Sequence, residues 1–172
     1  MRIPTFLAIL TAFLLASCIN EEMPENKGIE GGDPLPSFSI VLNDGTTVAT
    51  STLRGKVSVI EFFNTGCGDC REFFPTFQAL YEEFSGNPDV MVFSIAREED
   101  EASISAYWEA HSLTVPFSPQ TDRSVYNLFA TVGIPRVYIS DPEGVVRYVF
   151  TDADHPSLTD LINCVEALGV RL

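Results

Sequence analysis

The sequence has little positive charge, since its 172 residues hold 10 lysines and arginines against 24 aspartates and glutamates. The formal net charge of -14 repels phosphate backbones, so nucleic acid is not expected as a partner. Histidine is scarce as well, with His111 and His155 the two in the chain. Structural zinc needs about four ligands, and neither histidine shares a ligand spacing with a cysteine, so we expect no metal site.

Long apolar runs are also missing, apart from one short stretch at the N-terminus. Phe6 to Ala16 is too short to span a bilayer, follows Arg2 and ends in small residues, which is typical of an export signal. Leu15-Ala16-Ser17-Cys18 resembles the lipobox of bacterial lipoproteins, in which the cysteine is lipidated. The alternative is an ordinary signal peptide with a chance cysteine. We expect residues 1–17 to be a lipoprotein signal peptide, and Cys18 to anchor the protein to a membrane on the periplasmic side of the cell envelope.

The segment after this cysteine contains little that a protein core could bury. Residues 18–36 are acidic and rich in glycine and proline, which predicts a flexible linker. The remaining length suits one domain with a core of its own, and we find no internal repeat. We therefore expect a single folded domain over residues 37–172.

Strand and helix patterns alternate through this domain. Two apolar runs, 57–63 and 90–95, enclose an amphipathic helix and predict a βαβ unit with parallel strands. Turn residues at Asn43-Asp44-Gly45 and Asp141-Pro142-Glu143-Gly144 predict two hairpins. The expected fold class is α/β, a central mixed β-sheet with helices on both sides. Further strands are expected within 38–42, 46–48, 136–140 and 145–150, and helices within 73–84, 100–111, 122–130 and 158–168.

Two of the four cysteines, Cys67 and Cys70, form a C-x-x-C motif between a buried strand and a helix. Unpaired N–H groups and the helix dipole would stabilise a thiolate at Cys67, making it the attacking sulfur. Cys70, one turn further, would be more buried and would resolve the mixed disulfide. Half a zinc site or a structural disulfide are the alternatives, and the strand-helix context favours a redox dithiol. Cys164 fits a small buried hydrophobic residue of the last helix.

The residues around this dithiol resemble the thioredoxin superfamily, and more narrowly the TlpA/ResA-like extracytoplasmic reductases. The likeness runs from about Ser37 to Leu168 and implies a thioredoxin-like domain with an N-terminal β-hairpin. It also implies an extra helix within residues 100–130 and a kink in the active-site helix at Pro75. The motifs that carry it are Asp44-Gly45, Thr52-Leu53-Arg54-Gly55-Lys56, the run from Glu61 to Pro75, and Gly133-Ile134-Pro135.

Two more sites follow from this resemblance. Glu61 matches the buried acid of thioredoxin, whose pKa burial would raise, and it would relay protons to and from Cys70. The alternative is a glutamate that faces solvent at the strand edge. The resemblance also implies that Pro135 is cis and packs against the dithiol, which leaves the backbone of Ile134 free to pair with a substrate strand.

The chain departs from the family pattern at three positions near the dithiol, and one of them is Phe63, which replaces a common tryptophan three residues before Gly66. Gly66 replaces the usual tryptophan before the first cysteine and would leave the dithiol more open to a substrate. Asp69 replaces the usual proline and adds negative charge beside Cys67, which opposes thiolate formation and favours a reducing potential. Arg136 either offsets that charge, contacts the substrate, or is an ordinary surface arginine.

The leading hypothesis is a thiol:disulfide oxidoreductase that reduces exported protein disulfides without a cofactor. The resemblance implies apocytochrome c as substrate, a role in cytochrome c maturation, and a membrane electron donor as partner. Peroxide reduction would require a Thr-x-x-Cys arrangement that is missing here. The non-enzymatic alternative is a thioredoxin-fold lipoprotein that binds a protein partner or copper. Copper binding would need a third ligand such as His155 near Cys67.

Overall fold

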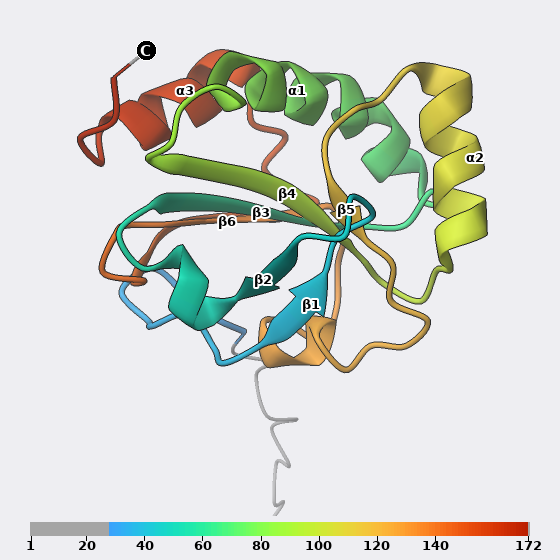
Figure 1. Ribbon diagram of the computed structural model, residues 1–172, viewed down its shortest axis with the longest axis horizontal. Coiled ribbons are helices and arrows are strands. Elements are labelled where there is room, and N and C mark those ends of the chain that lie inside the picture. Colours follow the sequence, from blue (N-terminus) through green and yellow to red (C-terminus); the bar gives the residue numbers. More distant parts are fainter. Residues whose placement is uncertain (1–27, 172) are drawn as a thin grey trace, which may run out of the picture.

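A five-stranded sheet forms the centre of the computed structural model, which describes residues 28–171 (Figure 1). The strand order is β5-β4-β3-β6-β7. The expected signal peptide, residues 1–17, and the expected lipidation site Cys18 lie outside the described residues. No helix within the described part is both long and apolar enough to cross a membrane. The strands are β3 (Val57–Phe63), β4 (Val90–Ala96), β5 (Phe117–Ser118), β6 (Arg136–Ser140) and β7 (Val146–Phe150).

Strand β3 is central because its apolar run is buried along its whole length. It pairs in parallel with β4 and antiparallel with β6, so the sheet is mixed. The parallel pairing confirms the predicted βαβ unit. In this register Glu61 lies opposite Ser94 of β4 and opposite Val137 of β6, which places a carboxyl group in the middle of the sheet.

The three α-helices belong to one face and one end of this sheet. Helices α1 (Gly68–Phe84) and α3 (Leu158–Glu166) lie side by side over one face, and α2 (Glu101–His111) stands near the end of the sheet where β4 finishes (Figure 1). Phe63 connects these parts, because its ring contacts Phe74 of α1 and Trp108 of α2. Helix α2 is the extra helix that the TlpA/ResA resemblance implies.

The opposite face is covered by a hairpin and short 3₁₀ turns instead of the expected α-helix. The hairpin consists of β1 (Ser39–Val41) and β2 (Thr47–Ala49), followed by the 3₁₀ turn η1 (Thr50–Leu53). The helix expected over 122–130 is wrong, since the structure has only the turn η2 (Tyr126–Leu128) there. A 3₁₀ turn aligns residues three apart. This spacing lets both Tyr126 and Phe129 pack against Phe62.

The folded domain also begins earlier than residue 37, the expected boundary. The N–H of Ile29 donates to the carbonyl of Phe129 at 2.7 Å, and the N–H of Gly32 donates to that of Val146 at 2.8 Å. Leu35 is 6% exposed and belongs to the core. The expected linker, 18–36, is therefore wrong for residues 28–36, because the side chains of Leu35 and Ile29 and the backbone hydrogen bonds fix this segment to the domain.

Candidate active site

The two motif cysteines differ in their exposure. Cys67 is the N-cap residue of α1 and is partly exposed, while Cys70 is fully buried in the first turn of the helix. Both thiols are free. Burial raises the pKa of Cys70 well above its usual range, and a hydrogen bond to Cys67 and the charge of Glu61 raise it further. The site therefore combines one accessible sulfur with one that is held protonated.

Glu61 lies buried below the dithiol in the middle of β3. Its side chain is 0% exposed, which excludes the alternative of a solvent-facing glutamate. The hydroxyl of Ser94 donates to its Oε2 at 2.7 Å, whereas Oε1 has no hydrogen-bond partner among the described residues. Burial raises the pKa of Glu61 to about 8, although the hydrogen bond from Ser94 lowers it in part. At neutral pH this carboxyl group is therefore mostly protonated.

The Ile134-Pro135 peptide bond faces the same sulfur. It is cis, as the resemblance implies. The thiol of Cys67 donates to the carbonyl of Ile134 at 3.5 Å, and the hydroxyl of Tyr126 donates to the carbonyl of Gly133 at 2.7 Å. The N–H of Ile134 makes no hydrogen bond to another described residue. The backbone beside Cys67 is thus positioned by its neighbours and retains a donor for another chain.

A tight turn before the dithiol explains the glycine at position 66. The N–H of Gly66 donates to Oδ1 of Asn64 at 2.8 Å, and the N–H of Cys67 donates to the Asn64 carbonyl at 3.0 Å. A Cβ atom on residue 66 would lie 2.9 Å from that same Oδ1, too close for an ordinary side chain. Gly66 is exposed, so the surface before Cys67 carries no bulky side chain.

Glu99 contacts the turn before Cys67, a role that the sequence did not reveal. In the sequence, the run of acidic residues after β4 indicates only the solvent-exposed start of a helix. Its Oε2 accepts the N–H of Thr65 at 2.7 Å, and its Oε1 accepts the Thr65 hydroxyl. Nε of Arg71 in turn donates to the Thr65 carbonyl at 2.5 Å. Parallel strands end at one edge of a sheet, so the pairing of β3 with β4 is the signal that could have placed Glu99 near the dithiol.

Replacing Glu99 with alanine is expected to loosen the turn before Cys67. The change leaves the buried Thr65 without an acceptor for its N–H and hydroxyl, which costs about 1–3 kcal/mol of unfolding free energy. Denaturant unfolding of Glu99→Ala measures this loss. The matched control is Glu101→Ala, which removes the same charge from an exposed position in the first turn of α2. Equal stabilities of the two variants would contradict the role of Glu99.

The structure does not bring Arg136 toward the dithiol. Nε of Arg136 donates to the carbonyl of Val132 at 2.9 Å, and one terminal nitrogen donates to the hydroxyl of Tyr138 at 3.5 Å. Neither of the two ion pairs among the described residues involves Arg136 or Asp69, and Asp69 is exposed in the first turn of α1. A substrate contact of Arg136 stays a prediction.

The copper-binding alternative needs a third ligand beside the two cysteines. Within residues 28–171, no group of three or more histidine, cysteine, aspartate and glutamate side chains is arranged to hold a metal ion. His155 instead lines a small cavity together with Pro135 and Phe73. No feature of the described site favours copper over disulfide chemistry.

Comparison with known proteins adds to this geometry. The model of the AhpC/TSA family matches residues 31–149. The thiol-disulfide oxidoreductase ResA of Bacillus subtilis is 23% identical over 161 residues, which cover 93% of this chain and 89% of that protein. ResA of Oceanobacillus iheyensis is 25% identical over 87% of this chain and 79% of that protein. A crystal structure of a thio-disulfide isomerase from Thermus thermophilus, 25% identical, superposes with a TM-score of 0.68 over 84% of this chain and 100% of that one.

Proposed function

Because the chain belongs to the AhpC/TSA family and is a TlpA/ResA-like thiol:disulfide oxidoreductase, we propose that it reduces disulfides of exported proteins through Cys67 and Cys70. The observation that carries this proposal is the asymmetry of the two thiols. Cys67 is partly exposed at the start of a helix, whereas Cys70 is buried near a buried acid. An accessible sulfur can attack a protein disulfide, and a sheltered neighbour can then resolve the product.

The reaction transfers two electrons in two exchange steps. The thiolate of Cys67 attacks one sulfur of the substrate disulfide, forms a mixed disulfide and releases the first substrate thiolate, which takes a proton from water. Cys70 loses its proton and attacks the sulfur of Cys67, which forms the Cys67-Cys70 disulfide and releases the second substrate thiol. The substrate is reduced and the dithiol is oxidised. A membrane electron donor, as the proposed partner, would then reduce the dithiol again.

Glu61 is the proposed acceptor of the proton that Cys70 must lose. A thiol whose pKa is raised by burial cannot ionise readily by itself. The pKa of Glu61, about 8, allows its ionised form to take up a proton near neutral pH. The unpartnered Oε1 leaves one carboxyl oxygen able to accept that proton.

The substrate is proposed to bind as an extended chain along the backbone of Ile134. Its N–H has no partner in the described structure, and its carbonyl lies 3.5 Å from the sulfur of Cys67. An extended polypeptide could therefore pair with this edge while its cysteine meets Cys67. Gly66 supports access, because it is exposed and itself carries no side chain next to Cys67.

The cellular setting is part of the same proposal. The lipobox-like residues before Cys18 support a lipid-anchored protein on the periplasmic side of the cell envelope. The TlpA/ResA likeness supports apocytochrome c as the substrate, with a role in cytochrome c maturation. It also supports a membrane protein as the electron donor.

The midpoint potential of the dithiol tests the proposed direction of electron flow. We expect a reversible two-electron couple at about -250 mV or below, because a dithiol that reduces protein disulfides needs a potential close to that of thioredoxin, about -270 mV. Equilibration in redox buffers followed by thiol trapping gives this value. A potential near about -120 mV would make the protein an oxidant. The absence of a reversible couple at Cys67 and Cys70 would contradict the proposed mechanism altogether.

A further inference from the structure

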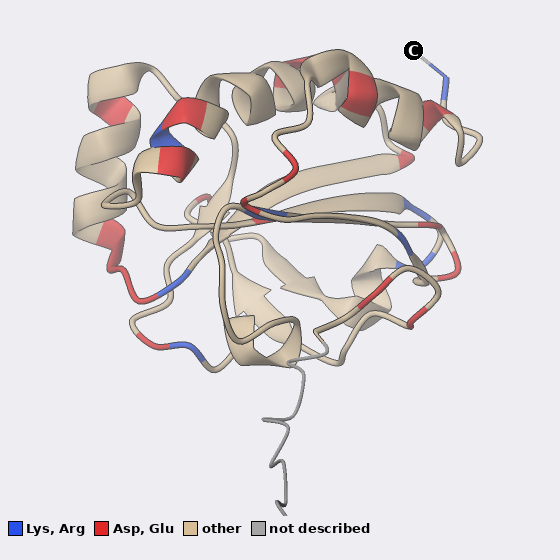
Figure 2. Cartoon of the chain, turned by 180° about the vertical axis from the view of Figure 1, so that it is seen from behind, with Lys and Arg blue, Asp and Glu red and all other residues tan. Residues whose placement is uncertain are grey.

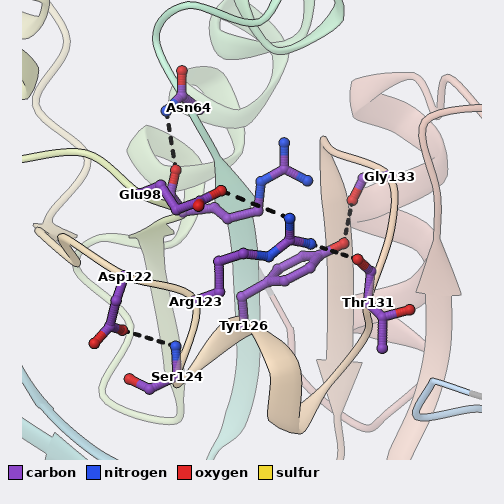
Figure 3. Close-up of polar contacts among 9 residues, drawn as sticks. Asn64, Glu98, Asp122, Arg123, Ser124, Tyr126, Thr131 and Gly133 are labelled. Atoms are coloured by element: carbon purple, nitrogen blue, oxygen red, sulfur yellow. Dashed lines mark hydrogen bonds and ion pairs between the residues drawn. The ribbon is translucent and has the colours of Figure 1, made fainter.

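Two arginines, Arg97 and Arg123, share the aromatic ring of Tyr126. Figure 3 shows Arg123 beside this ring. Arg97 follows directly after β4, and Arg123 precedes the turn η2. The guanidinium carbon of each lies 5.2 Å from the centroid of the Tyr126 ring. The attraction of a cation to an aromatic face holds both side chains over the same buried residue.

This cluster of Arg97, Arg123 and Tyr126 is joined to both loops that form the site. On one side the hydroxyl of Tyr126 donates to the carbonyl of Gly133, next to the Ile134-Pro135 bond. On the other side Nδ2 of Asn64 donates to the carbonyl of Arg97 at 3.0 Å (Figure 3). The cluster is therefore connected both to the loop that carries Asn64 and to the loop that carries the Ile134-Pro135 bond.

The positive charge of the cluster is not balanced within the described structure. Arg123 forms an ion pair of 3.7 Å with the exposed Glu98 and donates to the carbonyl of Thr131. Nε of Arg97 is buried and has no hydrogen-bond partner among the described residues. No carboxylate of a described residue lies within 4.0 Å of the Arg97 guanidinium. Buried donors are nearly always paired in proteins, so this one calls for an acceptor.

Acidic residues are spread over most of the molecule (Figure 2), and Glu98, Glu99 and Asp122 adjoin the two arginines in sequence. Among the described residues, however, the ion pair of Arg123 with Glu98 is the one that either arginine forms. A net charge of -14 repels acidic proteins at a distance. Two guanidinium groups without a full set of acidic partners would still attract one carboxylate at short range, because ionic screening limits the wider field to about 8–10 Å. Such an arrangement suits recognition of one acidic group close to the reacting disulfide.

We propose that Arg97 and Arg123 bind an aspartate or glutamate side chain of the substrate polypeptide, near its disulfide cysteine. The inference rests on the proposed function, because Tyr126 connects this cluster to the loop of Gly133 and Ile134, with which the substrate chain would pair. Guanidinium groups match carboxylates in shape and charge, and the guanidinium of Arg97 has no carboxylate partner among the described residues. Because this acidic side chain belongs to the same polypeptide as the disulfide, the two arginines would select substrates with an acidic residue near the cysteine.

Two disulfide peptides test this selection. One carries glutamates at the second and third residues on each side of its cysteine, and the other carries glutamines there. At low salt, we expect the kcat/KM of the wild-type protein for the acidic peptide to be at least about fivefold higher than its kcat/KM for the glutamine peptide. Added salt should lower this ratio of the two kcat/KM values. The ratio should approach one in Arg97→Gln, fall below one in Arg97→Glu, and stay partly above one in Arg97→Lys.

The matched control is Arg171→Gln, which removes one positive charge from an exposed side chain near the C-terminal end of the described chain. It should retain the wild-type ratio. Thermal unfolding of each variant shows whether the fold is kept. A wild-type ratio of one, or a preference that survives in Arg97→Gln, would overturn the carboxylate site.

A binding measurement separates this inference from the proposed reductase activity. The same peptides with serine in place of cysteine are titrated into isotope-labelled protein, and the Nε–H resonances of Arg97 and Arg123 are followed by NMR. Selective shifts with the acidic peptide would support the site even if no peptide were reduced, which would contradict the reductase proposal alone. Equal shifts with both peptides, or none, would overturn the carboxylate site whatever the activity.

Discussion

Replacing Cys70 with serine is expected to turn the protein into a covalent trap for its substrates. Cys67 stays partly exposed at the start of α1 and can still attack a disulfide. A serine hydroxyl does not attack the resulting mixed disulfide, so the adduct accumulates and turnover falls by about a thousandfold or more. Intact-mass spectrometry under non-reducing conditions, followed by mapping of the adduct to Cys67, measures this outcome.

Two other cysteine variants serve as controls for the trap. Cys67→Ser should form no adduct, because the remaining motif sulfur is fully buried. Cys164→Ser should turn over like the wild type, because Cys164 lies in α3, outside the candidate site. Adducts that form on Cys70 in the Cys67→Ser protein would reverse the two proposed roles.

Much of the fold follows from local patterns in the sequence. The apolar run of residues 57–63 coincides with β3, because a strand buried on both faces must be apolar almost throughout. Turn residues around Asp44 and Asp141 mark the two hairpins that the structure contains. The position of Cys67 at a helix start likewise follows from the order of strand, motif and amphipathic stripe.

Local patterns fail where tertiary contacts decide the structure. Residues 122–130 have an apolar spacing that suits a helix, but Tyr126 and Phe129 must both contact Phe62, and a 3₁₀ turn achieves this. Strand β5 is only two residues long, too short for any periodic pattern. Leu35 and Ile29 are isolated apolar residues in a polar segment without a periodic pattern, so the burial of Leu35 could not be foreseen.

In the candidate site, too, some residues can be found from local sequence patterns and others only from tertiary contacts. Cys67, Cys70 and Glu61 can be found from sequence because motif spacing and an acid in an apolar run are visible in one dimension. The contact of Glu99 with Thr65 depends on how two strands end together, and the shared ring of Arg97 and Arg123 depends on the path of a loop. Neither pair is separated by a spacing that sequence reasoning can recognise.

Glu61 is expected to make the wild-type protein less stable as pH rises from 5 to 8. The pKa of Glu61 is about 8 in the folded protein against an ordinary value of 4.5, so unfolding releases a proton within this window. Raising the pH therefore favours the unfolded state, by roughly 4 kcal/mol across the window. Glu61→Gln removes this titration and should lose little stability over the same range.

The difference between the two unfolding curves isolates Glu61 from every other titrating group. Burial keeps Cys70 protonated throughout this range, and the aspartates with lowered pKa values are ionised throughout it, so neither contributes. Groups that titrate alike in both proteins cancel in the difference.

The side-chain amide in the Glu61→Gln variant can still accept the hydroxyl of Ser94, so any remaining difference in unfolding free energy is constant with pH. Denaturant unfolding at several pH values gives both curves, with Glu101→Gln as the exposed control. Parallel curves for the wild type and Glu61→Gln would show that Glu61 ionises normally, and would remove it as the proton acceptor of Cys70.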